Sequence, residues 1–361
     1  MKRLLLTSLF ILLSFVMAFA RIGDVSFAYG VDASTYFDNR ENDGGGNLFT
    51  SSMTVFGARI APEIGLSVRD SHRLMGGVNL LRDFGSSKTL DADIFFYYNL
   101  EKRLSERTHF GLSAGIFPRT KSRGYYSEAF FSDSLKFYDP NFEGILFRFD
   151  HPHSYYELGV DWIGQKGPGC RERFMIFSAG EYHPTDFLKL AYSAYMYHFA
   201  SSDEVSGVVD NILLNPYVEF DAGRMASLQR LSLSIGWLQA VQRDRVMSGE
   251  YLFPGGLEAV FDIRKWNVGV NNRFFYGSDM MPLYNNCDAG GYKYGTQLYY
   301  GLPYYRVRAE CFDGFKAYDR AEVYWEPRIA EGLYFKIAAV FHFNGAFSGS
   351  QQIISIRYVI H

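Results

Sequence analysis

The chain has 361 residues, among them 27 Tyr, 33 Phe and 35 Gly, and its formal net charge is −3. So small a charge argues against a nucleic-acid partner and against strong electrostatic steering. Three cysteines, Cys170, Cys287 and Cys311, are an odd number for an oxidising compartment. The sequence leaves two alternatives open, a bridge between Cys287 and Cys311 or three unpaired thiols.

Residues 1–20 have the pattern of a secretory signal peptide. Lys2 and Arg3 precede an apolar run that ends in small residues at Ala20. The alternative is a retained membrane helix, but the run is short for the about 20 apolar residues that such a helix needs. We expect cleavage after Ala20, which leaves residues 21–361 as one domain. No Cys begins that domain, so we expect no lipoprotein anchor.

Beyond the signal peptide no apolar run is long enough for a helical membrane span, so strands must do any crossing. Segment after segment alternates apolar and polar residues with a period of two, as a sheet with two different faces requires. In 320–329, for example, Val323 and Trp325 lie on one face, and Arg320 and Glu322 on the other. In chain order the predicted strands are 23–37, 52–68, 74–84, 90–100, 108–118, 142–150, 154–163, 173–182, 187–199, 211–221, 230–242, 257–264, 266–276, 320–329, 333–344 and 350–361.

The connections between these strands differ in length, which is a second, independent signal. Short polar turns tend to alternate with longer or Gly-rich segments, the longest being 118–141 and 277–319. Membrane barrels have short turns on the periplasmic side and long loops outside. We therefore predict an all-β fold, a closed antiparallel transmembrane β-barrel of about 16 strands, within a range of about 14 to 18. Residues 294–312 form either a hairpin within the long loop or one further pair of strands.

A soluble β-sandwich also alternates, and it is the main competing fold. Charged residues recur on the polar face of most strands, and aromatic residues such as Trp162, Trp266 and Tyr358 lie toward strand ends. Interfacial aromatic girdles of membrane barrels have this placement. These features favour the barrel.

The domain from Arg21 to His361 resembles bacterial outer-membrane porin-like barrels. Its last strand alternates Ile356 and Tyr358 with polar residues, as does the C-terminal strand that the barrel-assembly machinery recognises in that class. It departs from the class at the last residue, His361, where Phe or Trp is usual. The resemblance implies a Gram-negative cell outer membrane, contact with its lipid and with the assembly machinery, and compatibility with a homo-oligomer.

In a membrane barrel the polar faces point into the lumen. The charged residues of these faces are basic mostly from residue 264 onward, which suggests a transverse field across a pore; the alternative is that opposite charges pair across neighbouring strands. The predicted lumen residues are Arg59, Glu63, Asp91, Asp93, Glu157, Asp161, Glu219, Asp221, Glu258, Asp262, Arg264, Arg273, Arg320, Glu322, Glu326, Arg328, Lys336 and Arg357.

Enzymatic motifs are missing from the sequence: there is no Gly-x-Ser-x-Gly, no His-x-x-Glu-His, no paired Cys-x-x-Cys and no phosphate loop. His151 and His153 are interpreted as residues of a solvated turn, and His342 as a hydrogen-bonded lumen residue. Tyr299 and Tyr300 in the long loop would either stack on sugars or anchor the loop. We expect no catalytic residue, metal or cofactor, and no enzyme.

A barrel of about 16 strands is too wide for its own side chains to fill. The expected function is therefore passive diffusion of small polar solutes. The alternatives are a plugged or narrow barrel for surface binding or assembly and, third, an enzyme at the barrel rim. Loops 118–141 and 277–319 decide whether the lumen is open.

Overall fold

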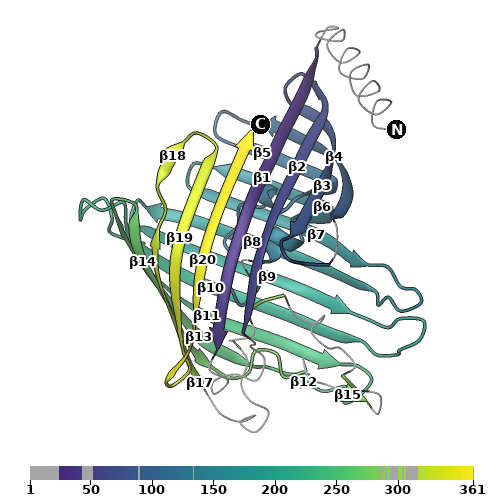
Figure 1. Ribbon diagram of the computed structural model, residues 1–361, viewed down its shortest axis with the longest axis vertical. Coiled ribbons are helices and arrows are strands. Elements are labelled where there is room, and N and C mark those ends of the chain that lie inside the picture. The colour runs from purple at the N-terminus through teal and green to yellow at the C-terminus, as the bar shows by residue number, and fades with distance from the viewer. Residues whose placement is uncertain are drawn as a thin grey trace.

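The computed structural model describes residues 24–42, 52–87, 90–132, 134–283, 287–288, 291–292, 300–302, 305 and 316–360. Within these residues, 16 antiparallel strands form one closed barrel (Figure 1). Among the described residues, helical structure is confined to η1 (Arg119–Lys121) and α2 (Leu135–Tyr138), both in the connection between two strands. No described helix is long and apolar enough to span a membrane.

Each barrel strand pairs with its neighbours in chain order. The barrel strands are β1 (Val25–Asn42), β2 (Met53–Val68), β3 (His72–Asp83), β4 (Asp91–Arg103), β5 (His109–Pro118), β6 (Asn141–His151), β7 (Ser154–Gly164), β8 (Arg173–Thr185), β9 (Leu188–Phe199), β10 (Val209–Asp221), β11 (Arg230–Asp244), β13 (Gly255–Lys265), β14 (Val268–Gly277), β17 (Lys316–Trp325), β19 (Leu333–Phe343) and β20 (Phe347–Ile360). The short strands β12 (Tyr251–Leu252) and β18 (Arg328–Ala330) pair with β11 and β19, whereas β15 (Cys287–Asp288) and β16 (Gly291–Tyr292) pair with each other.

The first and last strands close the barrel. β1 pairs with β2 on one side and with β20 on the other, in a register that runs from Val31 opposite Ile360 to Asn42 opposite Gly349. Figure 1 shows the two strands side by side, in purple and yellow. Closure leaves no free sheet edge, so the backbone N–H and C=O groups of the wall are paired within the protein, as a lipid environment demands.

The two faces of the wall are inverted relative to a soluble protein. On β17, Val323 and Trp325 are 47% and 45% exposed, whereas Arg320 and Glu322 are only 3% and 4% exposed. Apolar side chains thus cover the outside and polar ones the inside. This arrangement confirms the predicted closed membrane barrel over the sandwich.

The predicted strands agree closely with the observed ones except at the end of the first strand, where β1 continues to Asn42, and around residue 320. Instead of 320–329, β17 covers Lys316–Trp325, and β18 follows Pro327 as a separate short strand. Pro327 has no N–H to donate to a ladder, so it ends the pairing of β17. The loop predicted at 277–319 is correspondingly shorter. The proposed hairpin at 294–312 and the proposed bridge between Cys287 and Cys311 lie outside the described residues.

Connection length distinguishes the two ends of the barrel. At one end the strands are joined by tight turns, such as Trp266 and Asn267 between β13 and β14, whose φ values of +53° and +65° suit a two-residue hairpin turn. At the other end lie most of the longer connections, including 119–140 and 278–315. Long connections face the cell exterior in this class of barrel, so we call this the outer end.

Candidate functional site

The connection between β5 and β6, residues 119–140, folds into the barrel; we call it the interior segment. Its Phe130 is fully buried, and the ring lies 5.1 Å from that of Tyr195 on β9. The Tyr126 ring lies 6.1 Å from that of Phe177 on β8. These aromatic contacts hold the interior segment against the inner wall and fill the lumen there.

Hydrogen bonds and ion pairs fix the interior segment to β7. Arg119 forms an ion pair with Asp161, Nη2 to Oδ2, at 3.0 Å. Glu157 accepts hydrogen bonds from the hydroxyls of Ser122 at 2.7 Å and Tyr126 at 2.9 Å. Burial, together with the neighbouring Glu157 charge, raises the pKa of Tyr126, so its hydroxyl keeps the proton that it donates.

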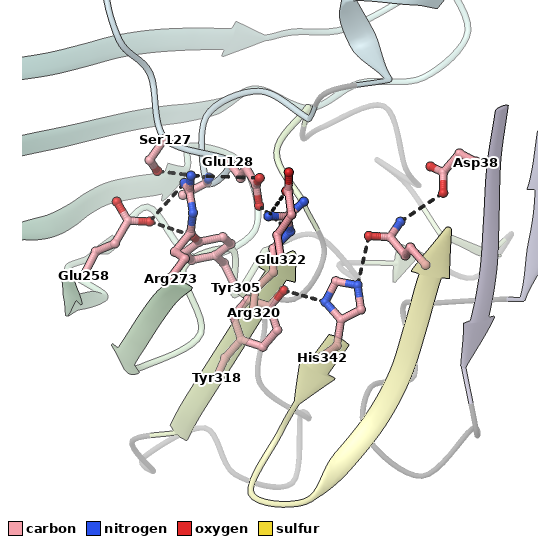
Figure 2. A network of polar contacts seen from close by, with 12 residues as sticks. Asp38, Ser127, Glu128, Glu258, Arg273, Tyr305, Tyr318, Arg320, Glu322 and His342 are labelled. Carbon is pink, nitrogen blue, oxygen red and sulfur yellow. Dashed lines mark hydrogen bonds and ion pairs between the residues drawn. The ribbon is translucent and has the colours of Figure 1, made fainter. Parts of the chain in front are cut away.

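Glu128 links the interior segment to the opposite side of the wall (Figure 2). Its two carboxylate oxygens lie 3.9 Å from Arg273 Nη2 on β14 and 3.5 Å from Arg320 Nε on β17. Arg273 also faces Glu258 at 3.7 Å, and Arg320 pairs with Glu322 at 2.7 Å. Acidic and basic side chains therefore alternate along a buried network that reaches from β13 to β17.

His342 belongs to a hydrogen-bonded chain at the outer end of β19. It is completely buried; its Nδ1 lies 2.9 Å from the Tyr318 hydroxyl and its Nε2 lies 2.9 Å from Oε1 of Gln351. Gln351 in turn donates to Asp38 at 3.3 Å. Both ring nitrogens are occupied by protein partners, so the geometry favours a structural role over an acid–base one.

The residues predicted to line the lumen differ in how deeply they are buried, and many of them form ion pairs with oppositely charged residues. Arg264 pairs with Glu326, Lys336 with Glu322, and Arg357 with Asp32. The transverse field across a pore stays a prediction. The buried members of this set are Arg59, Glu157, Asp161, Glu258, Arg273, Arg320 and Glu322. The partly buried members are Glu63, Glu219, Asp221, Asp262, Arg264, Glu326, Lys336 and Arg357, and the exposed members are Asp91, Asp93 and Arg328.

A second polar group, His198, Asp210 and Arg245, lies on the outside of the wall; we call it the outer-face cluster. His198 and Asp210 are cross-strand partners at the outer ends of β9 and β10. Their neighbours in sequence, Tyr197 and Asn211, are fully buried, so His198 and Asp210 belong to the opposite, membrane-facing side. The cluster therefore lies where the apolar band meets the outer headgroup region.

The geometry of the outer-face cluster suits acid–base chemistry. His198 Nδ1 lies 3.3 Å from Asp210 Oδ1, and Arg245 holds the same carboxylate through Nε at 2.5 Å and Nη2 at 2.9 Å. Hydrogen bonding to Asp210 raises the pKa of Arg245, which stays charged. A histidine whose Nδ1–H points at a carboxylate presents Nε2 as a base.

An aromatic ladder runs across neighbouring strands, from the outer end of β7 through β8 to this histidine on β9. Trp162 stacks on Phe174 with ring centroids 5.4 Å apart, and Phe174 stacks on His198 at 4.8 Å. Trp162 is 44% exposed. The ladder offers acyl chains an apolar surface that ends at a titratable ring.

Neither Glu128 nor the outer-face cluster was predicted from the sequence. Glu128 lies in a loop, where no periodicity indicates which way a side chain points. His198 and Asp210 could have been found, because each is a polar residue on the otherwise apolar face of its strand. Polar residues on a lipid-facing strand position are costly and therefore indicate function.

The sequence matches a family model described as lipid A 3'-O-deacylase-type over residues 23–233. His198 and Asp210 lie within the match, whereas His342 lies outside it. No curated protein matches the chain.

Solved structures with a similar fold are outer-membrane proteins of low sequence identity. A loop L8 deletion mutant of OmpT, an outer membrane protein of Vibrio cholerae, aligns with a TM-score of 0.55 at 9% identity, over 94% of this chain and 100% of that chain. OccK3 of Pseudomonas aeruginosa gives 0.52 at 10% identity, over 92% of this chain and 95% of that chain. These likenesses support the fold.

Proposed function

The chain belongs to the lipid A 3'-O-deacylase-type family, and we propose that it is an outer-membrane enzyme that hydrolyses an acyl ester of lipid A. This membership overturns the expectation that the chain is not an enzyme. That expectation relied on contiguous motifs, which suit catalytic residues on one turn or loop. On a barrel wall the catalytic groups lie on neighbouring strands, and their spacing in sequence follows loop lengths.

The placement of the outer-face cluster is the observation that carries the proposal. Lipid A places its acyl chains in the apolar layer and its sugar headgroup at the interface. A base at the outer end of a lipid-facing wall therefore meets the ester region of a lipid that stays in the membrane. His198 occupies this position, and the aromatic ladder beside it on β7 and β8 offers a surface for the acyl chain.

The proposed step is hydrolysis with water as the nucleophile. His198 Nε2 removes a proton from water as the oxygen attacks the ester carbonyl carbon, and Asp210 stabilises the imidazolium through Nδ1. The tetrahedral intermediate then expels the sugar alkoxide, which takes the proton from His198. Ester and water thus give a fatty acid and a free hydroxyl, with no redox change.

The test is mass spectrometry of lipid A after incubation with the folded protein in mixed detergent micelles. The expected product has lost one ester-linked acyl chain. His198→Ala is expected to lower kcat by about 10²- to 10⁴-fold, the usual contribution of a general base. Asp210→Asn should lower kcat with little change in KM, because the Asp210 carboxylate acts on the charge of the imidazole.

A matched control is available in the same barrel. His183 also faces a carboxylate, Glu181, at 3.5 Å, but at the end with the tight turns. His183→Ala should leave the rate unchanged. Wild-type protein that is folded yet leaves lipid A intact would refute the proposed activity.

Passive diffusion of solutes, the function expected from the sequence, is the weaker proposal. The interior segment crosses the lumen and is bound to β7, β9, β14 and β17. This is the plugged arrangement that the sequence analysis treated as an alternative. A homo-oligomer and recognition by the assembly machinery stay predictions.

A further inference from the structure

A cavity of about 280 Å³ remains inside the barrel, between the interior segment and the wall made by β1, β2, β19 and β20. It borders a smaller cavity of about 40 Å³, and the two share Arg59, Thr120, Lys136 and Arg357 as lining residues. The smaller cavity continues toward Ile360, the last described residue of β20. The outer-face cluster lies on other strands and on the other side of the wall.

The larger cavity has a basic lining. Four cationic side chains line it, Arg59 from β2, Lys136 from α2, Lys336 from β19 and Arg357 from β20, and no described carboxylate does. Two carboxylates pair with these cations: Asp32 with Arg59 at 2.7 Å and with Arg357 at 3.0 Å, and Glu322 with Lys336. Asp32 and Glu63 also line the adjoining smaller cavity. Cations thus outnumber the carboxylates that balance them.

Lys136 supplies the excess positive charge. It lines the cavity from the interior segment as a solvent-exposed residue, and among the described residues it forms no ion pair. An ammonium group beside guanidinium groups attracts an anion through Coulomb forces. The barrel and its interior segment therefore present cations to the same space from two sides.

We propose that this cavity binds a small oxyanion, a solute that carries a phosphate or a carboxylate group. Guanidinium and ammonium groups bind such oxygens through charge-assisted hydrogen bonds. Arg59, Lys136 and Arg357 hold the anion. The bound anion bridges the interior segment and the wall, so it also stabilises the closed lumen.

The test is isothermal titration of the folded full-length protein in detergent with inorganic phosphate, and in a second arm with acetate. Saturable binding of one or both anions is expected, and the two affinities distinguish a phosphate site from a carboxylate site. Lys136→Gln should weaken binding by about tenfold or more. Lys136→Arg, which keeps the charge, should retain most of the affinity.

Lys102→Gln is the matched control. Lys102 is an exposed lysine on β4, at the end of that strand that lies away from the long loops. Heat-dependent gel mobility shows whether each variant has folded. If the folded wild-type protein binds neither anion, or if Lys136→Gln binds as tightly as wild type, the proposal is wrong. The deacylation assay is read separately, so either proposal can fail alone.

Discussion

At the scale of single residues, the environment of a polar side chain decides its role more than its type does. His198 and His342 both lie at outer strand ends, but one is on the membrane-facing side beside Asp210 and the other is buried between Tyr318 and Gln351. Only His198 has a ring nitrogen that a lipid substrate can approach. Glu128 is buried between two guanidinium groups, so its charge supports structure.

Replacing Glu128 tests that structural role. Glu128→Gln leaves Arg273 and Arg320 with one fewer carboxylate in a buried network, which should lower the free energy of unfolding by about 3 kcal/mol. Urea unfolding in lipid vesicles, followed by tryptophan fluorescence, measures the change. Glu106→Gln, in an exposed turn, should change it by less than about 0.5 kcal/mol. Equal effects of the two substitutions would contradict the role of the network.

At the scale of elements, the interior segment is a connection that behaves as part of the core. Strands β5 and β6 remain paired up to Pro118 and Asn141, so the hairpin could close without residues 119–140. Instead these residues enter the lumen, where Phe130 and Glu128 meet opposite walls. Their aromatic and ionic contacts offset the entropy lost by ordering a long loop.

Removing this element should open the barrel. Because Pro118 and Asn141 are cross-strand partners, a short Gly-Ser turn can replace residues 119–140 without disturbing the wall. We expect the wild-type protein to be silent in a planar bilayer and the shortened variant to give stepwise conductance. The same turn placed at residues 222–229, at the other end, is the control and should stay silent. A conducting wild type would show that the interior segment leaves a path open.

At the scale of the whole molecule, the barrel is organised by its lipid surroundings. Apolar residues such as Leu158, 51% exposed in the middle of β7, cover the outside because the bilayer and not a protein core receives them. The inside contains the buried charge network, the hydrogen-bonded tyrosines and the interior segment. This inversion is what the alternation in the sequence indicated.

A charge on the outer surface tests this organisation. Leu158→Arg should destabilise the folded barrel by about 2–4 kcal/mol, the cost of arginine near the bilayer midplane. Met225→Arg is the control, because Met225 is an equally apolar residue, 75% exposed, in the turn between β10 and β11 outside the apolar band. It should cost about 1 kcal/mol or less. Unfolding in vesicles measures both, and similar costs would contradict the predicted membrane position of β7.

The sequence by itself determined the strands, their two faces and the closed outer-membrane barrel, because alternation with a period of two is local and a lipid environment permits few other folds. Only the tertiary structure decided that residues 119–140 fill the lumen and that His198 meets Asp210 and Arg245. Those contacts join side chains from different strands and loops, and their spacing in sequence depends on the register and on connection lengths. A local pattern therefore predicted the wall, but barrel closure determined which residues lie together inside and outside it.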